Sequence, residues 1–110
     1  MKVVVVIPVL DEERSIAGVI DGIPRGLVQQ IIVVDGGSRD RTRVLAENAG
    51  AEVILEPRRG YGRACATGAM AAVEADILVF LDGDGSDFPE EMPQLLGPIF
   101  DGGADLVIGS

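Results

Sequence analysis

Short apolar runs rich in Val and Ile alternate along this chain with longer helical segments. Runs of four to eight β-branched and apolar residues between turn signals are typical of strands. We expect strands at Val3 to Ile7, Ile31 to Val34, Val53 to Leu55, Ile77 to Leu81 and Leu106 to Ile108, and helices at Glu13 to Asp21, Arg39 to Asn48, Gly62 to Glu74 and Pro89 to Phe100.

The predicted strands are continuously apolar rather than alternating, which indicates burial on both faces. Together with the strand-helix order, this predicts an α/β fold with a doubly wound, mostly parallel, Rossmann-like sheet. Ser38 suits the N-cap of the second helix and Pro89 the first turn of the fourth, while Pro98 should end or kink that helix. We find no linker or repeat, so residues 1–110 are expected to form one domain.

Polar residues concentrate directly after the predicted strands. They occupy residues 8–13, 35–40, 58–62 and 82–86. In a doubly wound sheet, ligands bind beyond the carboxyl ends of the strands, where the strand order reverses. These four polar loops therefore predict a binding site on one rim of the sheet.

Asp82 and Asp84 follow the fourth predicted strand in the segment Asp-Gly-Asp-Gly-Ser. Side chains two residues apart on an extended backbone point to the same side, so both carboxylates can reach one cation. Carboxylate oxygens suit Mg²⁺ and Mn²⁺, which usually arrive with substrate phosphates. Two alternatives stay open: a plain turn after a strand, and the first motif of haloacid dehalogenase-like phosphatases, with Asp82 as nucleophile and Asp84 as acid/base.

Two common nucleotide-binding motifs do not fit. A dinucleotide fold places its glycine-rich turn after the first strand, whereas this chain has Pro-Val-Leu-Asp-Glu-Glu there and its Gly60-x-Gly62 after the third. A phosphate-binding P-loop needs a lysine, and the only lysine is Lys2. NAD binding and P-loop chemistry are therefore not expected.

Composition narrows the function classes further. The 110 residues hold 18 Asp and Glu against 9 Lys and Arg, and this net charge of −9 argues against nucleic-acid binding. No apolar run approaches a membrane span, and the N-terminus lacks a signal-peptide layout, so we expect a cytoplasmic protein. Cys65 is the only cysteine and the chain has no histidine to activate it, which favours a packed thiol.

Taken together, the loops resemble a known family. The segments Val-Ile-Pro-Val-Leu-Asp-Glu-Glu, Val-Val-Asp-Gly-Gly-Ser-Arg-Asp-Arg-Thr, Arg-Gly-Tyr-Gly-Arg-Ala and Asp-Gly-Asp-Gly look like the successive signatures of family 2 glycosyltransferases with the GT-A fold. The match in order and spacing covers essentially the whole chain. The Arg-Gly-x-Gly-x-Ala stretch is most similar to members that glycosylate polyprenyl phosphates, such as the dolichyl-phosphate sugar synthases.

The resemblance implies a nucleoside diphosphate sugar as donor, with roles for individual residues. Pro8, Leu10 and Glu12 match the loop that holds the base and ribose, and Asp35 would lie beside the base. The narrower resemblance implies a polyprenyl phosphate acceptor at a membrane surface, to which the full-length protein would be peripheral.

The same resemblance places the diphosphate at the fourth strand. Asp82, Gly83 and Asp84 match the DxD motif, in which both carboxylates and a divalent metal, Mg²⁺ or Mn²⁺, hold the diphosphate. A metal there neutralises the charge that develops on the leaving group. Arg59 and Arg63 would add cationic contacts to the same group.

The chain also departs from the family pattern. Gly36 stands where the family often has a second Asp, and Asp11 where Asn is usual. The family's catalytic domain continues well past Ser110, so we expect a nucleotide-sugar-binding domain without the acceptor half, with the general base beyond this span and no sugar transfer by these residues alone. We also expect a homo-oligomer that covers exposed apolar surface. A non-catalytic nucleotide-binding module is the remaining alternative.

Overall fold

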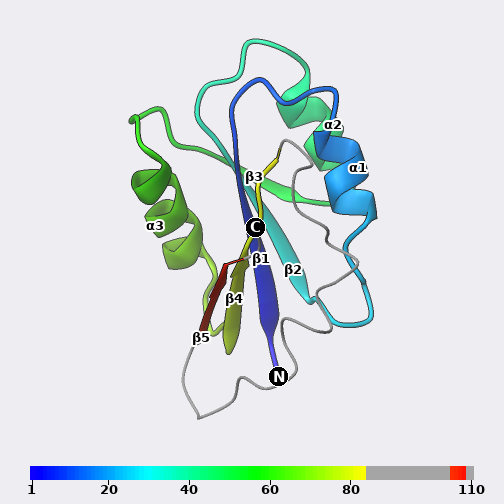
Figure 1. The fold of residues 1–110 in the computed structure, drawn as a ribbon, viewed down its shortest axis with the longest axis vertical. Coiled ribbons are helices and arrows are strands. Elements are labelled where there is room, and N and C mark those ends of the chain that lie inside the picture. Colours follow the sequence, from blue (N-terminus) through cyan, green and yellow to red (C-terminus); the bar gives the residue numbers. More distant parts are fainter. Residues whose placement is uncertain (84–104, 109–110) are drawn as a thin grey trace.

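The computed structural model of the chain describes residues 1–83 and the strand at 105–108. Strands and helices alternate, as the sequence predicts (Figure 1). Their order is β1 (Val3–Val9), α1 (Ile16–Asp21), β2 (Gln30–Asp35), α2 (Thr42–Asn48), β3 (Glu52–Leu55), α3 (Tyr61–Ala71), β4 (Ile77–Phe80) and β5 (Asp105–Ile108).

The strands form one five-stranded sheet in the order β3-β2-β1-β4-β5, and every neighbouring pair is parallel. Val5 in the central strand lies opposite Ile31 of β2 and Val79 of β4. The strand order reverses between β1 and β4, because β2 and β3 extend the sheet on one side and β4 and β5 on the other. The predicted doubly wound parallel sheet is confirmed.

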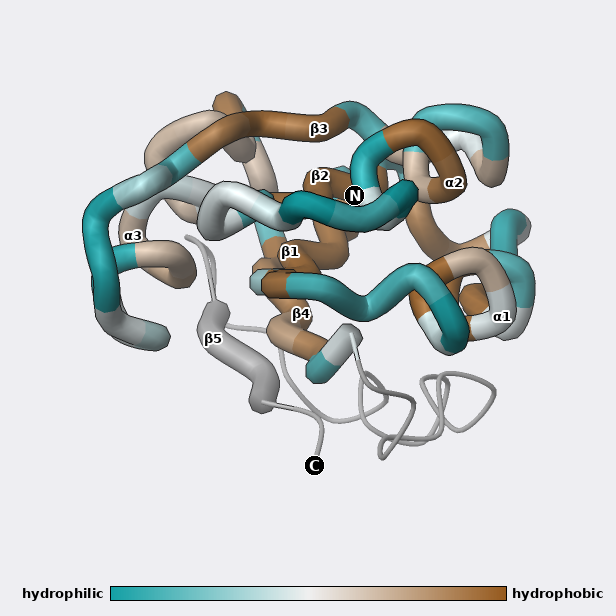
Figure 2. The backbone as a smooth tube through the Cα atoms, turned by 90° about the horizontal axis from the view of Figure 1, so that it is seen from above, coloured by the Kyte–Doolittle hydropathy of each residue, from teal (hydrophilic) through white to brown (hydrophobic). Residues whose placement is uncertain are grey.

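The central strand β1 serves two hydrophobic cores because successive side chains point to opposite faces. Val5 and Ile7 pack with α1 and α2 on one face, whereas Val4 and Val6 pack against α3 on the other. All four side chains are fully buried. Figure 1 shows α3 on one side of the sheet and the other two helices on the opposite side, and in Figure 2 the apolar strands lie between these layers.

Helix α3 approaches the sheet closely because its inner face carries small residues. Ala64, Ala69 and Cys65 line this face. Gly68 is buried, and a Cβ atom at this position would lie 2.3 Å from Cγ1 of Val6. The absence of a side chain at Gly68 therefore sets the spacing between α3 and β1.

The first two helices begin later than the sequence pattern indicates. α1 begins at Ile16 rather than Glu13, and α2 begins at Thr42 rather than Arg39. The N-cap of α2 is Arg41 and not Ser38, the residue that the sequence predicted. The backbone N–H and the hydroxyl of Ser38 instead donate to the carboxylate of Asp35. The residues before each helix are held in loop conformations by contacts between the two loops, described below.

The remaining boundaries differ for local reasons. β1 continues to Val9, whose carbonyl accepts the N–H of Gly36 at 2.9 Å. α3 ends at Ala71 rather than Glu74, and Glu74 adopts a left-handed conformation with φ of 62°. The predicted helix at Pro89 to Phe100, with Pro98, lies outside the described residues. Among the helices that are described, none is long and apolar enough to cross a membrane.

Candidate nucleotide-binding site

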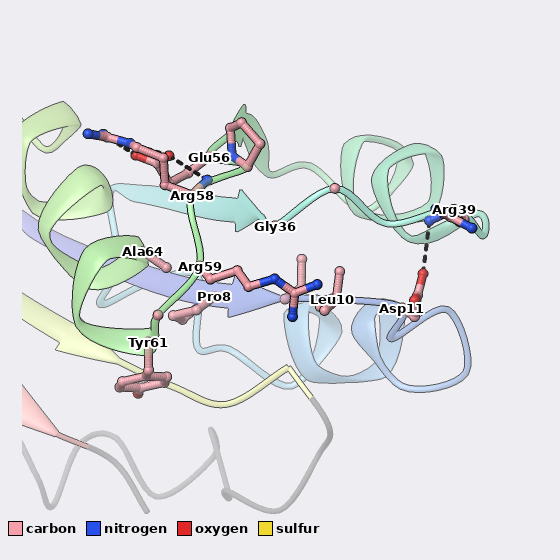
Figure 3. A pocket seen from close by; sticks show the side chains of 14 residues that line it. Pro8, Leu10, Asp11, Gly36, Arg39, Glu56, Arg58, Arg59, Tyr61 and Ala64 are labelled. Atoms are coloured by element: carbon pink, nitrogen blue, oxygen red, sulfur yellow. Dashed lines mark hydrogen bonds and ion pairs between the residues drawn. The ribbon is translucent and has the colours of Figure 1, made fainter.

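The carboxyl ends of β1, β2 and β3 surround a pocket of about 700 Å³ on the rim of the sheet that is uppermost in Figure 1. The loops that follow these strands and the first turns of α3 form its walls, as Figure 3 shows in close-up. The lining residues are Pro8, Val9, Leu10, Asp11, Gly36, Gly37, Arg39, Glu56, Pro57, Arg58, Arg59, Gly60, Tyr61 and Ala64.

Three of the predicted site residues line this pocket. Pro8 and Leu10 come from the end of β1 and the loop after it, and Arg59 comes from the loop between β3 and α3. In Figure 3 the side chain of Arg59 passes over Pro8 toward Leu10. Leu10 is 55% exposed, so it offers an apolar surface to a ligand rather than to the core. The structure therefore brings together the apolar side chains of Pro8 and Leu10 and the cation of Arg59 from separate loops.

Asp35 ends β2 but lies beneath the rim. It is fully buried, and its carboxylate accepts hydrogen bonds from the N–H of Gly37 at 3.3 Å, from the N–H of Ser38 at 3.1 Å and from the Ser38 hydroxyl. The Nε of Arg43 lies 3.5 Å from the same carboxylate. Asp35 is outside the pocket lining, and this geometry makes it the residue that shapes the loop after β2. Its predicted place beside a base stays a prediction.

The loops after β1 and β2 are held together by reciprocal hydrogen bonds. The Asp11 N–H donates to the Ser38 hydroxyl at 2.8 Å, and the Asp11 carboxylate accepts the Arg39 N–H at 2.9 Å. The N–H of Glu12 donates to the Thr42 hydroxyl at 2.8 Å. Asp11 adopts a left-handed conformation with φ of 53°, which Asp tolerates better than most residues.

Glu12 is half-buried in this arrangement and lies outside the pocket lining. Its backbone carbonyl accepts the N–H groups of Ser15 at 3.1 Å and Ile16 at 2.9 Å, which starts the turn that leads into α1. The backbone of Glu12 therefore links the first loop to both α1 and α2. A contact between its side chain and a ribose stays a prediction.

Asp82 follows β4, which lies beside β1 at the reversal of strand order. Gly83 packs so closely on β1 that a Cβ atom there would lie 2.5 Å from Cγ1 of Val9, and its carbonyl accepts the Ser15 hydroxyl at 2.6 Å. These contacts place Asp82 next to the β1 wall of the pocket, although it is not a lining residue. Asp84 lies outside the described residues.

The donor set at β4 fits a hard cation in its chemistry. Asp82 supplies carboxylate oxygens, the ligands that Mg²⁺ and Mn²⁺ prefer, and Gly83 leaves no side chain between this loop and β1. Within residues 1–83, no three His, Cys, Asp or Glu side chains gather into a metal-binding cluster. A metal at Asp82 would therefore need Asp84 or a ligand's own oxygens to complete its coordination.

Sequence reasoning missed Glu56, a buried carboxylate in the pocket wall. It directly follows β3 and is 4% exposed. Hydrogen bonds from Arg58 and from the Thr67 hydroxyl lower the pKa of Glu56 to about 2, so the side chain is ionised at neutral pH. A Glu before Pro-Arg-Arg at the end of a strand was a signal for such a pair, but on a surface loop this pattern usually indicates solvated charges.

Cys65 behaves as the sequence indicates. It is partly buried on the inner face of α3 against the sheet, and burial raises the pKa of its thiol. A raised pKa disfavours the thiolate, which is the reactive form.

A parallel doubly wound sheet, with a pocket at the carboxyl ends and a carboxylate at the reversal of strand order, defines the class of α/β nucleotide-binding domains. Within that class, the sequence profile of glycosyl transferase family 2 matches residues 4–110. The chain belongs to this family.

Named relatives and solved structures agree with that placement. An uncharacterised glycosyltransferase of Mycobacterium tuberculosis is 43% identical over 107 residues, which are 97% of this chain and 47% of the relative. A glucosyl-3-phosphoglycerate synthase of Mycolicibacterium paratuberculosis is 41% identical over 110 residues, covering 89% of this chain and 33% of the relative. The chain thus spans less than half the length of each relative.

The glucosyl-3-phosphoglycerate synthase of Mycobacterium tuberculosis has been solved in complex with Mn²⁺, UDP-glucose and phosphoglyceric acid. It superimposes with a TM-score of 0.78 and 38% sequence identity, over 92% of this chain and 40% of the synthase. A second complex of that synthase, with Mn²⁺, UDP and glucosyl-3-phosphoglycerate, gives a TM-score of 0.76. The expected GT-A fold is confirmed by these likenesses.

The family match also decides against the phosphatase alternative. Haloacid dehalogenase-like phosphatases usually begin their core fold with the motif that Asp82 and Asp84 resemble. Here the strand before Asp82 is the fourth along the chain, and the whole matched span belongs to a glycosyltransferase family. Asp82 is therefore not interpreted as a nucleophile.

Proposed function

We propose that this chain binds a nucleoside diphosphate sugar together with Mg²⁺ or Mn²⁺, as the donor-binding part of a family 2 glycosyltransferase that transfers the sugar to an acceptor. The observation that carries the proposal is the pocket of about 700 Å³ at the carboxyl ends of β1 to β3, with Asp82 beside it at the reversal of strand order. Its volume lies within the range of small-molecule sites.

The pocket's chemistry supports a nucleotide as ligand. Pro8 and Leu10 offer an apolar wall to a base, and the guanidinium group of Arg59 offers donors to oxygen atoms. α3 begins at the pocket, with Gly60 at its N-cap and no acidic residue in its first turn. A helix N-terminus favours negative charge, so the diphosphate would lie between α3 and β4.

Asp82, with Asp84, would hold the metal. A bound divalent cation would neutralise the charge that develops on the departing nucleoside diphosphate. The positions of Asp82 and Gly83 against β1 would keep the metal next to the pocket, so that one ligand can reach both. UDP is the nucleotide to test first, because solved relatives hold UDP with Mn²⁺.

The polyprenyl phosphate acceptor gains no support from the named relatives. The synthase complexes contain phosphoglyceric acid or glucosyl-3-phosphoglycerate instead. An acceptor of the polyprenyl class, with a membrane-peripheral full-length protein, therefore stays a prediction from the narrower resemblance. Phosphoglyceric acid is the acceptor that the relatives favour for a first assay.

Calorimetry tests the metal-dependent step. We expect UDP to bind the 110-residue chain in Mn²⁺ and to bind at least about tenfold more weakly after chelation, since a contact to a charged group contributes about 1.5–3 kcal/mol. Asp82→Asn should reproduce that loss with an unchanged melting temperature. Asp21→Asn, at the exposed end of α1, is the matched control and should bind like the wild type. Equal UDP affinity with and without the metal would refute the proposal.

A further inference from the structure

Glu56 is fixed by both the sheet and α3. Its backbone N–H donates to the carbonyl of Asp35 at 2.8 Å, which continues the edge of the sheet past β3. Its carboxylate accepts the hydroxyl of Thr67, from α3, at 2.7 Å. With only 4% exposure, the side chain has little freedom to move. Glu56 therefore provides a rigid anchor at the start of the loop that leads to α3.

Arg58 is attached to this anchor through three donors. Its Nε lies 2.9 Å and its Nη2 2.5 Å from the two carboxylate oxygens of Glu56, and its backbone N–H lies 3.1 Å from Oε2. A two-pronged guanidinium–carboxylate pair fixes direction as well as distance. The Arg58 side chain is 64% exposed, so the pair with Glu56 limits the freedom of a side chain that solvent would otherwise leave mobile.

Arg59 takes the opposite direction. Figure 3 shows the two arginine side chains leaving the loop on opposite sides, Arg58 beside Glu56 and Arg59 over Pro8 toward Leu10. Arg58 and Arg59 are adjacent residues of one short loop. If the backbone of this loop could rotate freely, either guanidinium group could point toward Leu10. The pair between Glu56 and Arg58 holds the guanidinium of Arg58 at the pocket wall. Arg59 is therefore the arginine of this loop whose guanidinium extends toward Leu10.

We propose that Glu56 is a positioning residue for nucleotide binding: by holding the Arg58 guanidinium against its own carboxylate, it directs Arg59 toward the oxygen atoms of the bound nucleoside diphosphate. The ligand in this inference rests on the proposed function, whereas the role of Glu56 is additional to it. A long side chain loses rotamer freedom when it binds, and a loop that is already oriented reduces that loss.

A double-mutant cycle tests whether Glu56 acts through Arg59. The affinity for UDP in Mn²⁺ is measured by calorimetry for the wild type, Glu56→Gln, Arg59→Ala and the double variant. We expect each single substitution to weaken binding by about tenfold, the effect of one charge-assisted contact. The double variant should bind no more than about twofold more weakly than Arg59→Ala. Glu52→Gln, which changes an exposed carboxylate at the start of β3, should bind like the wild type.

The other outcomes also decide the matter. If Glu56→Gln weakens UDP binding equally in the wild type and in Arg59→Ala, Glu56 has only a general structural role and the inference is wrong. If Glu56→Gln does not fold, Arg58→Ala tests the same link, because Arg58 is exposed and its loss should weaken UDP binding only while Arg59 is present. A wild-type chain that binds no nucleoside diphosphate would refute the proposed function itself, which is a different result from binding without coupling.

Discussion

Asp35 and Glu56 are the two buried carboxylates among the described residues, and each one shapes a loop of the rim. Asp35 accepts backbone and hydroxyl hydrogen bonds from Ser38, and Glu56 accepts those of Arg58 and Thr67. An ionised carboxylate without partners is costly to bury, so the chain around each one must supply donors. Single buried charges thereby determine the conformation of residues that line the pocket.

The pair at Glu56 predicts a pH-dependent contribution to stability. Because the folded pKa is about 2 and the usual value 4.5, the contribution is fully present above about pH 4.5 and is lost as the pH falls toward 2. The difference in urea midpoint between the wild type and Glu56→Gln should therefore be largest near pH 7 and shrink between pH 5 and pH 2.5.

Arg58→Ala gives an independent check of that prediction, since it removes the same pair from the other side. The difference in urea midpoint between Arg58→Ala and the wild type should shrink over the same pH range. A difference that stays constant down to pH 2.5 would contradict the assignment of the low pKa to this pair.

At the scale of elements, the two faces of the sheet are covered differently. α1 and α2 pack larger side chains such as Ile16, Ile20 and Leu45 on one face, whereas α3 presents alanines and Gly68 to the other. A helix with small inner residues lies closer to the strands. The first turn of α3 lines the pocket through Tyr61 and Ala64, so this close packing also sets the position of one pocket wall.

Gly68→Ala should therefore destabilise the fold by about 1–3 kcal/mol, the usual cost of overpacking a core. The added Cβ would lie 2.3 Å from Cγ1 of Val6 and 3.1 Å from Cγ2 of Val34. Gly62→Ala, in the same helix, meets no atom within 4 Å and is the matched control. Because Ala favours helix more than Gly, it should raise stability by a few tenths to about 1 kcal/mol. Urea denaturation measures both, and equal effects would contradict this account of α3.

The sequence predicted which segments form strands and helices better than it predicted where α1 and α2 begin. Continuous apolar runs identify β1, β2 and β4 because burial on both faces leaves a local signature. The starts of α1 and α2 depend on hydrogen bonds such as that from Asp11 to Ser38, which join loops 27 residues apart in the chain. Glu56 was missed for the same reason: its partner Thr67 comes from a helix that only the tertiary fold brings near.

At the scale of the whole molecule, the five described strands are parallel and the polar loops that follow β1, β2 and β3 collect at one end. At the opposite end lies a smaller hollow of about 120 Å³, lined in part by Arg25, Gly50 and Glu52. The edge strand β3 is four residues long and begins with exposed Glu52, features that discourage pairing with another copy. The expected homo-oligomer stays a prediction.

Because the polar loops lie at one end of the sheet, we can predict where amide hydrogen exchange should slow when UDP and Mn²⁺ bind. With UDP and Mn²⁺ at about a hundred times the dissociation constant, binding stabilises the bound form by about 2.7 kcal/mol. Amides at residues 9–11, 36–39 and 58–61 should exchange more slowly by up to about a hundredfold. Amides at residues 22–29 and 49–51, at the other end of the strands, serve as the internal control. Protection confined to that other end would place the ligand elsewhere and contradict the site.

The chain order of the pocket has a consequence for protein engineering. All fourteen lining residues fall between Pro8 and Ala64, whereas the first carboxylate of the proposed metal site comes later, at Asp82. On the proposed function, recognition of the nucleoside and capture of the metal would thus be encoded in consecutive stretches that meet at the seam between β1 and β4. Grafting residues 1–64 between family members should carry over the preference for a base while each recipient keeps its own metal, provided Val9 and Gly83 still fit together at that seam.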